Sequence, residues 1–191
     1  MTDVRPRVAL AIVAGGTSTR MGRDKANLTI SGVSMLSRLA ALGAAVGLPV
    51  LVCGRTQPAN WNGPAATFLV DAIAGEGPLR GLEAALSHAD DVLLIACDMP
   101  LLCDEDLRWL LSITPAVHGT AVSRGGQIEP LFSRYRATCR PLLAAELAAG
   151  RRSPARLLAT GTFTRIAAPP SVAAHLADAD TPGDWLSLTS S

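Results

Sequence analysis

Short apolar runs alternate with segments of helical spacing through the first half of the chain, and this alternation constrains the fold most strongly. The runs lie at 8–14, 49–54, 67–71 and 91–98. The first is apolar without interruption, which is typical of a strand buried on both faces, as in a parallel sheet. Helical spacing follows at 34–47, after Gly77-Pro78 and from Asp104 to Leu111. Repeated strand–helix–strand connections predict an α/β fold of three layers around a mainly parallel sheet.

The second half is less regular. We predict short strands around 117–122, 127–132 and 162–167 and helices near 136–149 and 153–159, with a last helix at Pro182. At 191 residues, the length suits one domain better than two. We divide this domain into a first half (1–115) and a second half (116–191).

Charge and cysteine content exclude several classes of protein. The net charge of +1 creates no strong field toward nucleic acid or an anionic membrane. The four cysteines form no CxxC pair and have no zinc-like spacing with the three histidines, which favours reduced thiols in the cytoplasm.

The basic start before 8–14 resembles a signal peptide, but glycines and further basic residues follow at once, so a buried strand is the better interpretation. His88, His118 and His175 have no partner spacing, and we expect ordinary surface or partly buried positions for them.

The loop after the first strand, AGGTSTRMGRDK, has the composition of a phosphate site. It matches neither the GxxxxGK[ST] loop nor GxGxxG. The turn at Gly15 and Gly16 offers backbone N–H groups, and Arg20, Arg23 and Lys25 add cations, which together suit a triphosphate. Lys25 is the only lysine beside sixteen arginines, which favours a specific role for its ammonium group. An ordinary surface turn is the alternative.

Acidic residues follow other strands. Ligands of such folds bind at the carboxyl ends of the strands, which places the first loop, Asp71 and Asp98 at one edge. Asp98, in CDMP, is a candidate Mg²⁺ ligand or a turn residue. Asp180, or the nearby Asp178, would add a second metal oxygen or cap the helix that starts at Pro182.

A basic segment, GRRSPARLL, is a candidate anion-binding site. Arg151, Arg152 and Arg156 flank a predicted helix start, where an anion would be stabilised. The alternative is a solvated surface.

The motifs AGGTSTRMGRDK, GEGPLRGL, CDMPLL, IEPLFSRY and DADTPGDW together resemble the molybdenum cofactor guanylyltransferase family over nearly the whole chain. The resemblance implies a Rossmann-like nucleotidyltransferase fold and transfer of GMP from MgGTP to molybdenum-molybdopterin, with release of pyrophosphate. Partners would be GTP, the molybdopterin cofactor, molybdenum-insertion proteins and recipient molybdoenzymes or their chaperones, with no nucleic acid or membrane. A cytidylyltransferase and a non-catalytic nucleotide-binding module remain alternatives.

Site residues follow from the loop, the strand ends and the resemblance. Those expected to act on the reacting phosphates are Arg20, Lys25 and Asp98. The expected nucleotide-binding residues are Val13, Ala14, Gly15, Gly16, Lys25, Asp71 and Asp98, in a nucleotide-binding half (1–115). The resemblance implies a phosphorylated acceptor, and we expect Arg151, Arg152 and Arg156 to bind it in an acceptor-binding half (116–191). Three departures from the family pattern affect these assignments: one residue fewer between Gly22 and the aspartate before Lys25, CGRTQ where the second-strand exit usually has asparagine, and DADTP in place of NxNTP.

Overall fold

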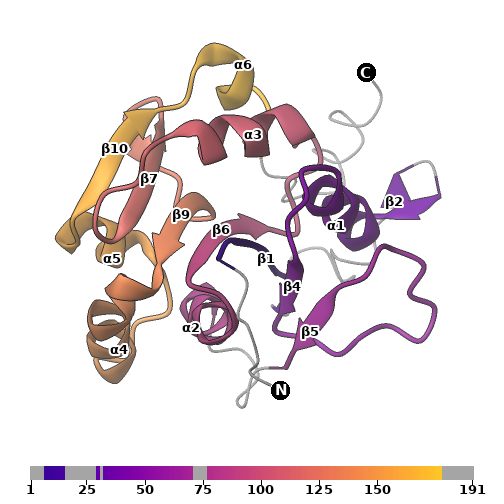
Figure 1. Cartoon of the computed structure of the whole chain (residues 1–191), viewed down its shortest axis with the longest axis horizontal. Coiled ribbons are helices and arrows are strands. Elements are labelled where there is room, and N and C mark those ends of the chain that lie inside the picture. Colours follow the sequence, from indigo (N-terminus) through magenta and orange to yellow (C-terminus); the bar gives the residue numbers. More distant parts are fainter. Residues whose placement is uncertain (1–6, 16–28, 31, 71–76, 178–191) are drawn as a thin grey trace.

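The computed structural model describes residues 7–15, 29–30, 32–70 and 77–177. One sheet runs through this part of the chain and has helices on both faces (Figure 1). Its strands are β1 (Ala9–Val13), β4 (Val50–Cys53), β5 (Thr67–Leu69), β6 (Asp91–Ala96), β7 (Gly119–Arg124), β8 (Gln127–Ile128), β9 (Phe132–Arg136) and β10 (Phe163–Ala167). The spatial order is β10-β7-β9-β6-β1-β4-β5, and β8 pairs with β7 outside this path. A separate pair is formed by β2 (Thr29–Ile30) and β3 (Val33–Ser34).

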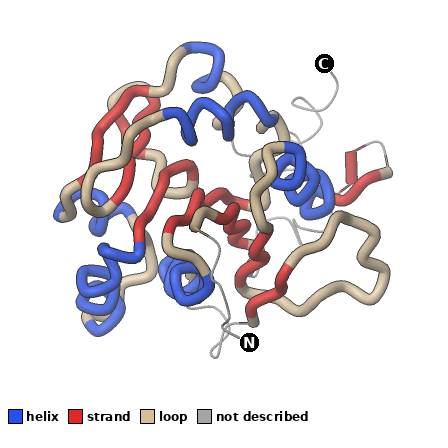
Figure 2. The backbone as a smooth tube through the Cα atoms, in the orientation of Figure 1, coloured by secondary structure: helices blue, strands red, loops and turns tan. Residues whose placement is uncertain are grey.

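Two groups of helices cover the sheet, as the helix and strand colours of Figure 2 show. One group is α1 (Met35–Ala45), α3 (Asp104–Ser112) and α6 (Pro170–Ala173); the other is α2 (Pro78–His88), α4 (Arg140–Ala148) and α5 (Ala155–Thr160). Strand β1 serves both cores, because Leu10 and Ile12 pack toward the first group while Ala11 and Val13 pack toward the second. Full burial on both faces explains its continuous apolar sequence and confirms the predicted three-layer α/β/α fold.

Most neighbouring strands run parallel. Strand β1 pairs in parallel with β4 and β6, β4 with β5, and β7 with β10. Strand β9 is antiparallel to both of its neighbours, β6 and β7. The prediction of a mainly parallel sheet is therefore confirmed. None of the described helices is long and apolar enough to cross a membrane.

The predicted boundaries between 127 and 139 were wrong. Instead of one strand at 127–132, Gly125 and Gly126 make a tight turn into β8, with φ of 56° and 84°, and β9 begins later, at Phe132. Position 136 ends β9, and a 3-10 turn (Ala137–Cys139) precedes α4. Pairing with β6, some forty residues earlier in the sequence, decides this boundary, because β9 is held between β6 and β7. The helix predicted at Pro182 lies outside the described residues.

A bidentate ion pair fixes the same strand from its side chains. The guanidinium of Arg134 on β9 donates to both carboxylate oxygens of Asp91 on β6, at 2.8 and 2.6 Å. Both residues are buried, so the pair is largely shielded from water. Its two hydrogen bonds favour the observed register of β6 and β9.

Candidate functional site

The carboxyl ends of four parallel strands are joined by backbone hydrogen bonds. Ala14 N donates to Cys53 O at 2.9 Å, which ties the end of β1 to the end of β4. Gly54 N donates to Leu69 O at 2.8 Å, which ties β4 to β5. On the other side, Cys97 N donates to the carbonyl oxygen of Val13 at 3.2 Å. The segments that leave β1, β4, β5 and β6 therefore start from one edge of the sheet.

This edge brings together two groups of predicted nucleotide-site residues. Val13 and Ala14 are each 8% exposed at the end of β1, and Gly15 is half-buried. Asp98 is also half-buried and directly follows Cys97. The hydrogen bond between Cys97 and Val13 thus places Asp98 beside the start of the glycine turn, although the two segments are more than eighty residues apart.

Other predicted site residues lie outside the described part of the chain. These are Gly16, Arg20, Lys25, Asp71 and Asp180. The described chain reaches Gly15 at the exit of β1 and Val70 at the exit of β5.

Two glycines of the GPLRG motif set how closely α2 approaches this edge. A Cβ atom on Gly81 would lie 3.1 Å from the Cβ of Cys53 and 3.6 Å from a methyl group of Val13. Gly77 has φ of 81° and ψ of −178°, and a Cβ there would lie 2.9 Å from the Cβ of Arg152. Small residues at these two positions let α2 start directly against the strand exits and the basic segment.

The basic segment docks onto the start of α2. Leu79 N donates to Arg152 O at 3.0 Å. Gly150, with φ of 72°, ends α4, and its N–H and that of Arg151 donate to carbonyl groups of the last helical turn at 2.9 and 3.1 Å. Because a helix that follows a parallel strand begins at the strand's carboxyl end, the segment at 150–152 lies at the ligand-binding edge.

Three predicted acceptor arginines differ in their surroundings. Arg151 donates to the carboxylate of Glu146 at 2.7 Å, and Arg156 lies 3.6 Å from its other oxygen. Arg152 is exposed and makes no ion pair with the described residues. Glu146 is only 8% exposed, so its carboxylate depends on Arg151 and Arg156 to balance its negative charge.

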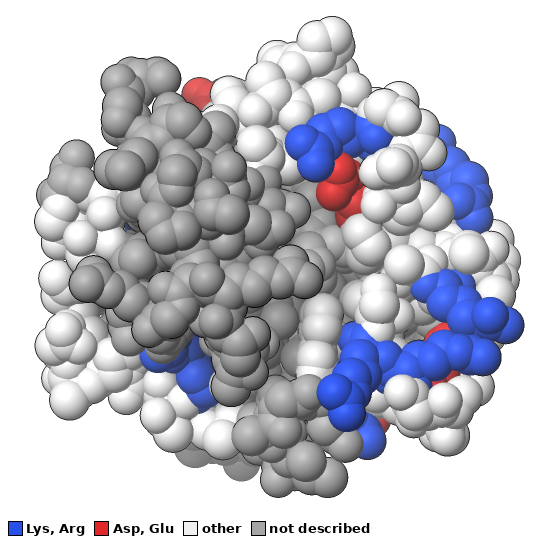
Figure 3. Space-filling view, turned by 180° about the vertical axis from the view of Figure 1, so that it is seen from behind, with Lys and Arg blue, Asp and Glu red and all other residues white. Residues whose placement is uncertain are grey.

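A small cavity of about 100 Å³ opens between α2 and the end of α4. Its walls are Arg80, Leu147, Gly150, Arg151 and Arg152. Figure 3 shows arginine side chains gathered around acidic atoms over the α4 end of the molecule. Arg80 was not predicted, although its place in the GPLRG motif was the available signal. The lining arginine side chains could therefore bind an anion in the cavity.

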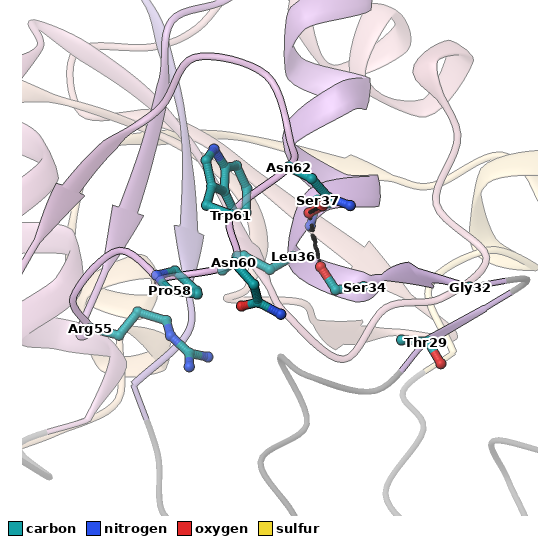
Figure 4. Close-up of a pocket in the computed structure, with 10 residues that line it drawn as sticks. All are labelled: Thr29, Gly32, Ser34, Leu36, Ser37, Arg55, Pro58, Asn60, Trp61 and Asn62. Atoms are coloured by element: carbon teal, nitrogen blue, oxygen red, sulfur yellow. Dashed lines mark hydrogen bonds between the residues drawn. The ribbon is translucent and has the colours of Figure 1, made fainter.

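A second cavity, of about 300 Å³, lies between the exit of β4 and the start of α1 (Figure 4). Ser34 Oγ donates to Ser37 Oγ at 2.9 Å, and Ser37 Oγ donates to the side-chain oxygen of Asn62 at 3.2 Å. Trp61 and Arg55 also line it. Arg55 belongs to CGRTQ, which departs from the family pattern, but the cavity itself was not predicted; its signal in the sequence is the polar turn PANWNG.

His175 is half-buried, as expected, but the absence of partner spacing in the sequence did not reveal its neighbours. Its Nδ1 lies 3.6 Å from the Cys103 sulfur and 3.1 Å from the carboxylate of Asp106. His118 accepts a hydrogen bond from the backbone of Thr162 at 2.7 Å, as a structural residue would. Contacts across the fold, 69 to 72 residues apart, cannot be read from local spacing.

Comparison with known proteins places the chain in a family. The model of the MobA-like NTP transferase domain matches residues 10–165. A curated relative from Synechococcus elongatus, named "Probable molybdenum cofactor guanylyltransferase", is 35% identical over 196 aligned positions, which cover 94% of this chain and 97% of the relative.

Solved structures support the fold. Molybdopterin-guanine dinucleotide biosynthesis protein A from Archaeoglobus fulgidus superposes with a TM-score of 0.74 at 20% identity, covering 95% of this chain and 96% of that one. Rv0371C from Mycobacterium tuberculosis, in complex with manganese, superposes with a TM-score of 0.64 at 15% identity, covering 98% and 100%. The family match and the 35% identity to the Synechococcus relative show that this chain belongs to the MobA-like NTP transferase family and is a nucleotidyltransferase.

Proposed function

We propose that the protein transfers GMP from MgGTP to molybdenum-molybdopterin and so forms the guanine dinucleotide form of the molybdenum cofactor. The observation that carries this proposal is the Cys97–Val13 hydrogen bond, which sets Asp98 close to the end of β1, where the glycine loop starts. A nucleotide whose phosphates lie over this loop would present its phosphate oxygens to the Asp98 carboxylate. The relatives named for this activity support the choice of substrates.

The reaction is a displacement at phosphorus. An oxygen of the acceptor's terminal phosphate attacks the α-phosphorus of GTP and forms a new phosphoanhydride bond. The bond from the α-phosphorus to the oxygen bridging to the β-phosphorus breaks, and pyrophosphate leaves with its electron pair. The attacking phosphate is already an anion, so no side chain is required as a general base. Catalysis then rests on positioning and on stabilising charge.

Each site residue has a role in this displacement. The backbone at Val13, Ala14 and Gly15 would position the nucleotide, and Gly16 would donate its N–H to a phosphate. Arg20 and Lys25 would neutralise charge on the triphosphate as it shifts toward pyrophosphate. Asp71 would contact the nucleotide from the exit of β5.

A divalent metal ion is typical of nucleotidyltransferases, and the residues fit Mg²⁺. Asp98 offers a carboxylate oxygen, the ligand type that Mg²⁺ prefers, and its half-buried position leaves part of the group facing outward for a shared ligand shell. Bound Mg²⁺ would neutralise negative charge on the phosphate oxygens. Asp180 is the candidate for a second oxygen ligand.

We assign acceptor binding to the second half of the chain (116–191), at the cavity between α2 and α4, and nucleotide binding to the first half (1–115). Arg80 on α2, from the first half, completes the cavity wall. Molybdopterin carries an anionic phosphate, and Arg151, Arg152 and Arg156 are cations not committed to GTP. Arg152 is the strongest candidate of the three for binding this phosphate, because Arg151 and Arg156 already share Glu146.

The remaining proposed partners are molybdenum-insertion proteins and recipient molybdoenzymes or their chaperones. We place the reaction in the cytoplasm, where cysteines outside disulfides stay reduced.

The test is pyrophosphate release by the purified full chain with molybdenum-molybdopterin and Mg²⁺, comparing GTP with CTP. We expect release with GTP and formation of the guanine dinucleotide. A preference for CTP would reassign the protein to the cytidylyl branch. Nucleotide binding without release of pyrophosphate would reduce it to a binding module.

Acceptor binding has its own test. Replacing Arg151, Arg152 and Arg156 together by Ala should weaken molybdopterin binding at least tenfold with little change in GTP affinity, because one charge-assisted hydrogen bond contributes about 1.5–3 kcal/mol. The single change Arg152→Ala avoids leaving Glu146 unpaired, and Arg108→Ala on α3 is the charge control. Calorimetric titration with each ligand separates the effects. An unchanged acceptor affinity, or an equal loss for GTP, would return these arginines to a solvated surface.

A further inference from the structure

Three side chains with metal-binding chemistry meet at the start of α3. Cys103 caps this helix, Asp106 lies in its first turn, and His175 follows α6. The Cys103 sulfur is 3.1 Å from Asp106 Oδ2 and 3.6 Å from His175 Nδ1. His175 Nδ1 is 3.1 Å from each carboxylate oxygen of Asp106. All three pairs are thus in contact.

The arrangement is a closed triangle and not a relay. In a cysteine–histidine–aspartate relay the two ring nitrogens face different partners, so that a proton passes across the ring. Here one nitrogen, Nδ1, faces both the sulfur and the carboxylate. Donor atoms of sulfur, nitrogen and oxygen that converge in this way can share one ion.

The edges of the triangle have nearly the lengths that a zinc ion requires. Zn–S, Zn–N and Zn–O bonds of about 2.3, 2.05 and 2.1 Å at tetrahedral angles separate the donor atoms by about 3.4–3.6 Å. The sulfur–nitrogen edge is 3.6 Å, and both edges to the carboxylate are 3.1 Å. Binding would require the carboxylate to withdraw by only a few tenths of an ångström.

We propose that Cys103, Asp106 and His175 bind a divalent, borderline-soft metal ion of the zinc class, with a fourth position open to solvent or to an incoming ligand. Thiolate and imidazole are poor ligands for Mg²⁺, so this site would select a different metal from Asp98. The proposal goes beyond nucleotidyl transfer and does not depend on it.

The surroundings support a bound cation. Cys103 N donates to Asp106 Oδ2 at 2.9 Å, which holds the carboxylate beside the sulfur, and Asp106 is 2% exposed. Arg38 on α1 lies near the thiol, and its Nη1 is buried without a hydrogen-bond partner in the described chain. The thiolate form of Cys103, the carboxylates of Asp106 and Glu105 beside it and the nearby guanidinium of Arg38 carry charges that sum to −2, which a divalent ion neutralises.

The thiol also predicts a pH dependence. Burial raises the pKa of Cys103 to about 11, and hydrogen bonds from its thiol to the carboxyls of Asp106 and Glu105 add to this effect. The metal-free thiol is therefore protonated at neutral pH, and a metal must displace its proton. Apparent affinity should rise about tenfold per pH unit between about pH 7 and pH 9, because one proton leaves for each ion bound.

The test is a Co²⁺ titration of the reduced, chelator-treated full chain in excess Mg²⁺ without nucleotide. We expect one Co²⁺ per chain with a thiolate-to-cobalt charge-transfer band, which Zn²⁺ displaces. Cys103→Ser should abolish the band, and His175→Gln should weaken binding at least about 100-fold, since even supporting residues of metal sites contribute 10–100-fold. Cys139→Ala and His88→Gln are the controls and should leave binding unchanged.

Two results would overturn the proposal. Absence of the band in the folded parent protein would mean that these side chains are joined only by hydrogen bonds. A band that survives Cys103→Ser would place the bound metal at another thiol.

Discussion

Gly77→Ala tests whether the start of α2 positions the basic segment. Gly77 has φ of 81° and ψ of −178°, a conformation essentially restricted to glycine, and another residue there costs about 1–3 kcal/mol. The new Cβ would also lie 2.9 Å from the Cβ of Arg152 and 3.1 Å from its carbonyl oxygen. Relieving that contact costs about 1–3 kcal/mol more. We expect the free energy of unfolding to fall by about 2–6 kcal/mol.

Gly47→Ala is the control. Gly47 also has a positive φ, of 74°, but a Cβ there would meet nothing within 4 Å, so its cost is the backbone strain alone, about 1–2 kcal/mol. Urea unfolding measures both variants. In the folded fraction of Gly77→Ala the acceptor KM should rise, because the contact moves Arg152, whereas Gly47→Ala should keep the parent value. Equal unfolding energies and an unchanged acceptor KM would refute the positioning role of Gly77.

Two further predictions concern the phosphate loop and the sheet. Lys25→Arg should lose turnover despite keeping its charge, because a planar guanidinium cannot occupy the position of a compact ammonium group; steady-state kinetics equal to the parent's would contradict this. Arg134→Met should lower the free energy of unfolding by about 3–5 kcal/mol, because it leaves Asp91 buried without its bidentate partner. In urea unfolding, Asp91→Leu combined with Arg134→Met should recover much of that loss, and a single variant within about 1 kcal/mol of the parent would show that the pair contributes little.

The sequence predicted the parallel half of the fold because local signals and tertiary structure agree there. Strand β1 is continuously apolar because it is buried on both faces, and Pro78 marks the start of α2. The prediction failed at β9, where pairing with β6 and β7 extends a strand to Arg136. Periodicity carries no information on a partner strand some forty residues away.

Part of the candidate site could likewise be predicted from local signals, and part of it could not. Its place at the carboxyl edge follows from the order of strands and helices, so Asp98 was predicted together with the first turn. Contacts between distant segments were not predictable: Arg152 meets Gly77, and His175 meets Cys103. Each depends on how two helices pack, which motif spacing does not encode.

The most direct test of the central claim is turnover of Asp98→Asn, measured as guanine dinucleotide formed from GTP and molybdenum-molybdopterin over a range of Mg²⁺ concentrations. Asp90→Asn, at the opposite end of β6, is the matched control. If Asp98 holds the metal against the phosphates, turnover should fall by at least about 10²–10³-fold at every Mg²⁺ concentration, as for loss of a group that stabilises transition-state charge. The unfolding midpoint and the Asp90→Asn rate should stay near those of the parent. Near-parent turnover by folded Asp98→Asn at saturating Mg²⁺ would contradict the account.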